Sequence, residues 1–227
     1  MIEINKVSML YQGGKIHALE EMSLQLKAGE FLFLVGPSGA GKSTLIKLLF
    51  REQLPTKGEI YFEGKDILAY KKEDILAHRR SIGMVFQDYK LIKQKTVFEN
   101  VAFALEILGF SPKEIQQKVP KALEKVGLGH KENAFPKELS GGEQQRVGIA
   151  RAIVKDPVLI LADEPTGNLD RDNALEVMKL FENINEEGTT IIIATHAWDL
   201  VDRMQKRVVA LSSGKLERDE RGGYTHE

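Results

Sequence analysis

The stretch Gly36-Pro37-Ser38-Gly39-Ala40-Gly41-Lys42-Ser43 decides the fold of this chain. An apolar run at 31–35 precedes it and a second apolar pattern follows from Thr44, as expected for a buried strand, a glycine loop and a helix start. Such a loop points backbone N–H groups at phosphate oxygens, and the helix N-terminus adds attraction for anions. Lys42 would contact the β- and γ-phosphates and the Ser43 hydroxyl would bind Mg²⁺. The alternative is a glycine-rich turn that matches by chance, and the full match between a strand and a helix disfavours it.

Composition limits the class of protein. The 227 residues suffice for one α/β domain, and 32 Lys and Arg against 33 Asp and Glu give a formal net charge of −1, so no nucleic acid is expected. The chain has no cysteine, which excludes disulfides and thiolate metal sites. No signal peptide is visible at the N-terminus, and apolar runs such as 158–162 are far shorter than the ~20 residues of a membrane span. We expect a protein that is soluble, or peripheral to a membrane through a partner.

Strand patterns dominate the first part of the chain. Residues 2–11, 18–27 and 59–62 predict an antiparallel layer that leans against a parallel core. Tyr11 ends the first of these strands, where its ring could stack on a purine. The alternative is a partly buried edge residue. The strand at 82–87 ends at Gln87, whose amide oxygen could coordinate Mg²⁺ or place a water molecule.

Helical periodicity replaces the strand patterns over residues 88–138, which predicts an inserted helical subdomain. Pro120 lies inside one of these periodic segments, so that helix should be kinked or split there. At 139–146, Ser140 and Glu143 have the spacing of a capping box. Gly141 and Gly142 are not needed for a cap, and they fit a second helix N-terminus that binds phosphate. The chain thus has two candidate phosphate-binding helix starts but only one loop with a lysine. A head-to-tail pair of chains, each completing the site of the other, would explain this.

Carboxylates and a histidine end the later strands. Asp163 and Glu164 follow the buried strand at 158–162, where Asp163 could hold Mg²⁺ and Glu164 could act as general base on the attacking water. The strand at 190–195 is followed by His196, which could donate a hydrogen bond to the γ-phosphate or to the transition state. Residues 207–211 predict a last strand, and the polar residues 217–227 predict a mobile tail.

Together these elements resemble the ATP-binding cassette (ABC) ATPases over nearly the whole chain. The matches are the Walker A loop, an adenine-stacking Tyr11, the Q-loop Gln87, the signature motif at 139–143, the Walker B pair Asp163 and Glu164, the D-loop with Asp170, and the switch His196. The resemblance implies one domain, with a RecA-like core at 1–87 and 139–216, a helical subdomain at 88–138 and a tail at 217–227. The implied fold class is α/β, a P-loop NTPase with a mostly parallel central sheet and an N-terminal antiparallel layer.

The same resemblance implies an ATPase that needs ATP and Mg²⁺ and forms a homodimer when ATP binds. Catalysis is assigned to Lys42, Glu164 and His196, the metal to Ser43, Gln87 and Asp163, and the contact across the dimer to Ser140, Gly141, Gly142 and Glu143. The implied ATP-binding set is Tyr11, Gly36, Pro37, Ser38, Gly39, Ala40, Gly41, Lys42, Ser43, Thr44 and Gln87.

Glu143 and the segment 165–170 are typical of the branch that holds FtsE-type cell-division ATPases, lipoprotein-releasing ATPases and MacB-like efflux ATPases. Residues 11–14, 86–89 and 96–102 resemble the FtsE type most. That resemblance implies a membrane partner of the FtsX type, a position on the cytoplasmic face of the cell membrane at the division site, and control of cell-wall hydrolysis. The alternative is the nucleotide-binding subunit of a lipoprotein or MacB-like exporter. A soluble ABC ATPase of DNA repair or translation is disfavoured, because no long coiled coil or second cassette is present.

A partner must contact the chain somewhere, and the segment after Gln87 holds more apolar residues than one helical face needs. Most of them should pack inside the helical subdomain. We expect Tyr89, Leu91 and Phe98 to form an exposed groove for a short cytoplasmic helix of the partner.

Overall fold

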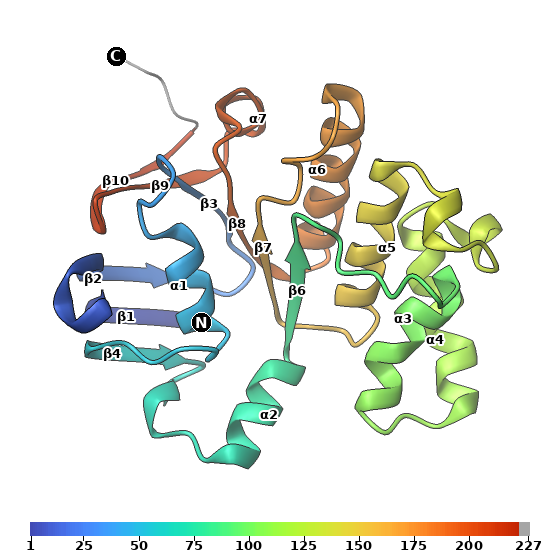
Figure 1. The fold of residues 1–227 in the computed structure, drawn as a ribbon, viewed down its shortest axis with the longest axis horizontal. Coiled ribbons are helices and arrows are strands. Elements are labelled where there is room, and N and C mark those ends of the chain that lie inside the picture. Colours follow the sequence, from blue (N-terminus) through green and yellow to red (C-terminus); the bar gives the residue numbers. More distant parts are fainter. Residues whose placement is uncertain (223–227) are drawn as a thin grey trace.

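The computed structural model describes residues 1–222 and arranges them around two β-sheets (Figure 1). The first sheet is antiparallel and has the order β2-β1-β4-β5. Its strands are β1 (Ile2–Tyr11), β2 (Ile16–Leu26), β4 (Lys57–Phe62) and the short β5 (Lys65–Asp66). The predicted antiparallel layer is therefore confirmed, with the second strand beginning slightly earlier than its apolar pattern indicated.

The second sheet has the order β10-β9-β3-β8-β7-β6. Its strands are β3 (Phe31–Val35), β6 (Ile82–Phe86), β7 (Leu159–Asp163), β8 (Thr190–Ala194), β9 (Arg207–Ser212) and β10 (Lys215–Arg221). All neighbours pair in parallel except β9 and β10, which form an antiparallel hairpin. This confirms the predicted fold class. The carboxyl ends of β3, β6, β7 and β8 meet at one edge, where α/β sheets bind ligands.

The predicted mobile tail is wrong as far as Arg221, because residues 217–221 belong to β10. Their alternation of exposed and half-buried side chains is that of an edge strand, which a polar composition hid. The rest of that prediction, residues 223–227, lies outside the described residues.

The helices are α1 (Lys42–Leu49), α2 (Lys72–Arg80), α3 (Val97–Ile107), α4 (Pro112–Lys125), α5 (Gly141–Ile153), α6 (Arg171–Glu186) and α7 (Trp198–Met204). Figure 1 shows α3, α4 and α5 gathered on the side of the molecule away from the antiparallel sheet. The helix that contains Pro120 is continuous, so of the two predicted outcomes, a kink or a split, the split is excluded. Thr96 and Ser111 cap α3 and α4 with capping boxes. Among the described residues, the helices are too short and too polar for any of them to span a membrane.

Strand β3 separates the two parts of the hydrophobic core. Leu32 and Leu34 face the antiparallel sheet and α1, whereas Phe31, Phe33 and Val35 face the cluster formed by α3 to α6. All five side chains are buried, as expected for a central parallel strand covered on both faces. The loop that carries Lys42 begins at the end of this strand. Packing on both faces of β3 therefore fixes the first residue of the loop.

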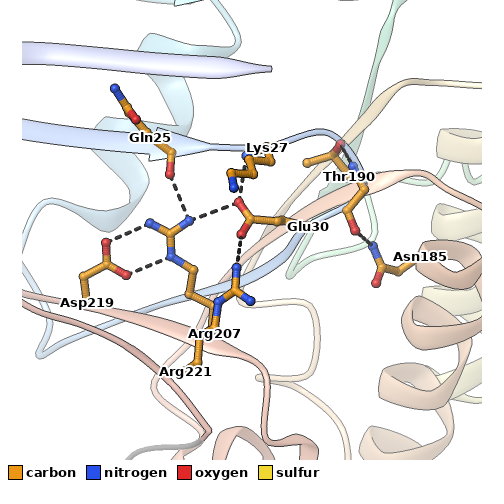
Figure 2. A network of polar contacts seen from close by, with 9 residues as sticks. Gln25, Lys27, Glu30, Asn185, Thr190, Arg207, Asp219 and Arg221 are labelled. Carbon is orange, nitrogen blue, oxygen red and sulfur yellow. Dashed lines mark hydrogen bonds and ion pairs between the residues drawn. The ribbon is translucent and has the colours of Figure 1, made fainter.

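A polar network joins the end of β10 to the start of β3 (Figure 2). The Arg207 guanidinium binds both carboxylate oxygens of Asp219 at 2.8 Å, and it also donates to Glu30 at 3.1 Å and to the Gln25 carbonyl at 2.9 Å. Arg221 adds a second donor to Glu30 at 2.9 Å. The hydrogen bonds that Arg207 donates to Asp219 are the main reason why the pKa of Arg207 is raised above its ordinary value. This network fixes β10 to the edge of the sheet.

Candidate active site

The loop between β3 and α1 has a backbone that requires glycine. Gly36 and Gly41 adopt φ values of 142° and 109°, which side chains rarely allow. A Cβ at Gly36 would lie 2.1 Å from the Leu211 carbonyl oxygen, and one at Gly41 would lie 2.5 Å from that of Ala18. The loop is therefore packed tightly between β2 and β9.

Lys42 is only 8% exposed, and its Nζ donates to the carbonyls of Gly36 at 2.7 Å and Pro37 at 3.1 Å. The ion pairs of the described residues do not include Lys42, so its charge is held at the loop by main-chain dipoles and no carboxylate neutralises it in a direct contact. A buried cation in this state favours an anionic ligand.

Ser43 and Asp163 come together from the start of α1 and the end of β7. The Ser43 hydroxyl donates to Asp163 Oδ1 at 3.1 Å. Burial raises the pKa of Asp163, and the hydrogen bond from Ser43 opposes that rise. One hydroxyl and one carboxylate oxygen thus face each other beside the loop, which is the donor chemistry that Mg²⁺ prefers.

Glu164 and His196 form a second pair at the same edge. The His196 ring Nδ1 lies 2.8 Å from Glu164 Oε1, and the His196 backbone N–H donates to Oε2 at 3.3 Å. Glu164 has a φ of 50°, and its own N–H donates to Ala194 at the end of β8. The strained backbone and these hydrogen bonds turn the carboxylate toward the loop instead of into the next turn.

Gln87 follows β6 and is held by Asn168. The Gln87 Nε2 donates to Asn168 Oδ1 at 3.2 Å, and Asn168 Nδ2 donates to the Gln87 carbonyl at 3.1 Å. Because Gln87 uses its Nε2 in this contact, its amide oxygen remains available as an acceptor or a metal ligand. The sequence placed Asn168 in the D-loop but did not show that it contacts Gln87.

These groups enclose a cavity of about 540 Å³ lined by Ser38, Gly39, Ala40, Gly41, Lys42, Ser43, Thr44, Gln87, Glu164 and His196. Backbone N–H groups, one buried cation and one base in such a cleft fit a nucleoside triphosphate. Among residues 1–222 there is no group of three or more His, Cys, Asp or Glu side chains that could hold a metal by themselves. Ser43, Asp163 and Gln87 would therefore supply part of a Mg²⁺ shell and phosphate and water the rest, as is usual for this ion.

The signature segment begins α5. Ser140 accepts from the Glu143 N–H at 3.2 Å and Glu143 accepts from the Ser140 N–H at 2.9 Å, so the predicted capping box is present. A hydrogen bond from Lys131 and the one from Ser140 lower the pKa of Glu143. A Cβ at Gly142 would lie 2.2 Å from Asn173 Oδ1 on α6, which explains that glycine by packing within the chain. None of these four signature residues lines the 540 Å³ cavity described above.

Asn173 is a residue that the sequence did not reveal. It donates from its backbone and its side chain to the two carboxylate oxygens of Asp170, at 2.9 and 2.6 Å, while its own Oδ1 lies against Gly142. The backbone hydrogen bond is the main cause that lowers the pKa of Asp170. Asn173 therefore joins the D-loop to the signature helix. Only the order of the elements in space, which periodicity does not give, brings these segments together.

Tyr11 does not line the cavity. Its ring packs against the buried cluster beneath the antiparallel sheet and its hydroxyl donates to Gln53. Stacking of Tyr11 on an adenine ring stays a prediction.

The three residues expected to form the partner groove lie elsewhere. Leu91 and Phe98 are partly buried against the core, and the Tyr89 hydroxyl lies 3.0 Å from the position of a Cβ at Gly141. The apolar groove of the structure, about 430 Å³, lies instead between α2, β6, α3 and α5. Its lining includes Leu76, Met84, Phe86, Phe103 and Ile107, with Arg79, Arg80, Lys90, Arg151 and Lys155 around them. The sequence-based placement of the groove is corrected accordingly, because helical spacing alone did not show which apolar side chains the core would take up.

Comparison with known proteins agrees with this geometry. The family model described as ABC transporter matches residues 19–167. The chain is 52% identical to the cell division ATP-binding protein FtsE of Bacillus subtilis, over 99% of this chain and 98% of that protein. It is 47% identical to the protein of the same name from Escherichia coli K12, over the full length of both. The predicted resemblance to the FtsE type is confirmed.

Solved structures show the same cassette. The fold superimposes on a dimeric, post-hydrolysis ATP-binding cassette, MJ0796, bound to ADP and Pi, with a TM-score of 0.86 and 35% identity over 97% of this chain and 98% of that one. A second dimeric structure of MJ0796 gives a TM-score of 0.87 with 37% identity, over the same shares of the two chains. The chain therefore belongs to the ABC transporter family and is an ATPase of the ABC type.

Proposed function

We propose that this chain is the ATP-hydrolysing subunit of a cell-division complex, in which it forms a homodimer on binding ATP and drives an integral membrane partner of the FtsX type. The names of its most similar relatives support the cell-division role. The main support for the dimer is that Ser140–Gly142 do not line the cavity of their own chain. A second chain in head-to-tail orientation brings its signature helix to that cavity. The proposed location is the cytoplasmic face of the membrane at the division site, and the proposed output is control of cell-wall hydrolysis.

Each residue of the cavity has a distinct role in this proposal. Lys42 and the loop N–H groups bind the phosphates. Ser43, Asp163 and Gln87 would hold Mg²⁺, which would neutralise negative charge on the phosphates. Glu164 takes the proton of the attacking water. His196 orients Glu164 through the contacts that the structure shows, and from its exposed position it can also donate to the developing charge.

The corrected groove is the proposed contact for the partner. Ile107 is 63% exposed and Leu76 48% exposed, and both line this one groove together with Phe103. Exposed apolar side chains that gather in one groove mark an interaction site more than single ones do. The floor is apolar and the surrounding side chains are basic, so the matching segment is a short amphipathic helix that carries acidic residues. A lipoprotein-releasing or MacB-like exporter partner is the alternative, and the identity of the membrane protein that co-purifies decides between them.

The test uses Glu164→Gln, which keeps the shape of the base but removes its proton affinity. With saturating ATP and Mg²⁺ this variant should form a stable dimer by light scattering and should hydrolyse ATP at least ~100-fold more slowly than the native chain. Glu186→Gln, an exposed position on α6, is the matched control and should change neither property. A monomeric Glu164→Gln, with the membrane partner also present, would refute the shared site.

The same preparation tests the partner. The native chain and an Ile16→Glu control, altered at an exposed apolar residue of β2, should co-purify with an FtsX-type protein from membranes. Ile107→Glu should lose that protein while it still binds ATP. Undiminished capture by Ile107→Glu would remove the groove from the proposal, and capture of a lipoprotein-releasing or MacB-like subunit would favour the alternative.

A further inference from the structure

Arg151 connects the signature helix to the loop that carries Gln87. It lies near the end of α5 and is partly buried, and burial lowers its pKa below the ordinary value. Its Nη1 donates to the Lys90 carbonyl at 2.6 Å and its Nη2 to the Tyr89 carbonyl at 2.8 Å. The ion pairs of the described residues do not include Arg151, so these two carbonyls are its main polar contacts. A planar guanidinium is the side chain that can hold two adjacent carbonyls at once.

The two carbonyls belong to an unusual piece of backbone. Tyr89 and Lys90 have φ values of 58° and 49°, so two consecutive residues with side chains adopt the left-handed conformation. That conformation is unfavourable for both residue types and persists only where surrounding contacts impose it. Arg151 contacts both of these residues, which makes it the natural source of that constraint.

Tyr89 approaches α5 at two further points. The Tyr89 hydroxyl is 3.0 Å from the Cβ position of Gly141, and the Tyr89 carbonyl is 3.7 Å from that of Gly148. Gln87, two positions before Tyr89, lines the nucleotide cavity. A change at Gln87 therefore reaches α5 through this loop, and α5 begins with the segment that would face the partner's nucleotide.

Arg151 is not needed to place α5 itself. A Cβ at Gly83 on β6 would lie only 2.8 Å from the Ala152 carbonyl, so the helix already packs tightly on the sheet beside Arg151. Val147, Ile149 and Ala150 are also buried in the core on the same helix. The guanidinium of Arg151 therefore serves to hold the loop and not to place the helix.

We propose that Arg151 is a positioning residue that fixes the Gln87 loop to the signature helix, so that the state of one nucleotide site sets the position of the signature segment offered to the other. This proposal rests on the ATP-dependent dimer proposed above. It assigns to Arg151 a role in turnover and dimer formation and none in the binding of ATP to a single chain.

The test compares Arg151→Met, Arg151→Lys and the control Arg146→Met. Arg146 lies on the same helix, but its Nη1 donates to Glu176 on α6, away from the Gln87 loop. In the Glu164→Gln background, Arg151→Met should raise the ATP concentration needed for half-maximal dimer formation at least tenfold. Nucleotide affinity under conditions that keep the chain monomeric should change less than twofold. In the otherwise native chain, kcat should fall at least tenfold, with a smaller change in KM.

Arg151→Lys keeps the charge but can hold only one carbonyl well, so its loss should fall between those of the native chain and Arg151→Met. Arg146→Met should change dimer formation less than twofold. The proposal would be overturned if Arg151→Met formed the dimer at the same ATP concentration as the chain with Arg151 intact. If Arg151→Met does not fold, the same comparison with Arg151→Lys decides. A failure of Glu164→Gln itself to dimerise with Arg151 intact would instead overturn the proposed function, so the two failures are distinguishable.

Discussion

Two polar regions of this molecule hold distant segments together, and they treat charge in opposite ways. In the network of Figure 2, Arg207 faces Glu30 and Asp219, and Arg221 faces Glu30, so each cation has a carboxylate in the same chain. At the phosphate-binding loop, Lys42 is buried and contacts main-chain carbonyls instead. A neutralised network stabilises the fold, whereas a buried charge without a counter-charge stabilises the complex with an anion. Substitutions at the loop should therefore mainly change ATP affinity, and substitutions in the network should mainly change stability.

The largest effect is expected at the loop. Lys42→Ala should weaken ATP binding at least ~100-fold, because charge-assisted hydrogen bonds to phosphate contribute about 1.5–3 kcal/mol each. The melting temperature without nucleotide should stay close to that of the native chain. Isothermal titration with ATP and Mg²⁺ checks the affinity, with Lys47→Ala on the same helix as control. A large loss of stability without nucleotide would show that the Lys42 contacts serve the fold, and the contrast between the two regions would disappear.

The second effect is expected in the network. Arg207→Met should lower the free energy of unfolding by about 2–4 kcal/mol. It leaves Asp219 without the guanidinium that binds both of its oxygens and removes one of the donors to Glu30, which is 15% exposed. ATP affinity should change less than twofold. Urea denaturation measures the change, and Lys215→Met, which removes an exposed pair with Glu20, should lower it by less than ~0.5 kcal/mol. If both variants lost the same free energy of unfolding, the buried network would contribute no more to stability than an exposed ion pair does.

The smallest effect is expected at Asp163 and depends on pH. Burial raises its pKa in the folded chain, so the folded state binds the proton more tightly than the unfolded state does. Its ionisation therefore costs stability as pH rises through the folded pKa, and that cost is absent below the unfolded pKa. Asp163→Asn should be more stable than the native chain at neutral pH without Mg²⁺, by less than about 1 kcal/mol because the group is partly exposed. Thermal melts at pH 7 and below pH 4 check this, and an equal difference at both pH values would contradict it.

The sequence predicted most of the strands and nearly every residue that lines the cavity. The glycine-lysine motif predicted the loop residues. Gln87, Glu164 and His196 were predicted from the ends of apolar runs, because parallel strands bring their carboxyl ends to one edge. The contacts that support them were not predictable in this way. Asn168, Asn173 and Arg151 act across elements far apart in the chain, and a single polar residue in a helix or turn carries no periodic signal.

Two errors have the same physical origin. The edge strand β10 is mostly exposed, so its residues from Glu217 on lack the apolar alternation by which strands are found. The groove was misplaced because Leu91 and Phe98 pack on the core while Phe103 and Ile107, from the same helical pattern, do not. In both cases the tertiary neighbours decided which side chains are covered.

The position of β3 has a consequence for how the chain is made. This strand pairs on one side with β8 and on the other with β9, and both of these belong to the last part of the chain. During synthesis the phosphate-binding loop therefore emerges long before either neighbour of its strand exists. Contacts so distant in sequence close late in folding, and until then β3 presents two open edges of a very apolar strand. We therefore expect a chain truncated before residue 207 to expose this strand and to aggregate instead of acting as a weak enzyme.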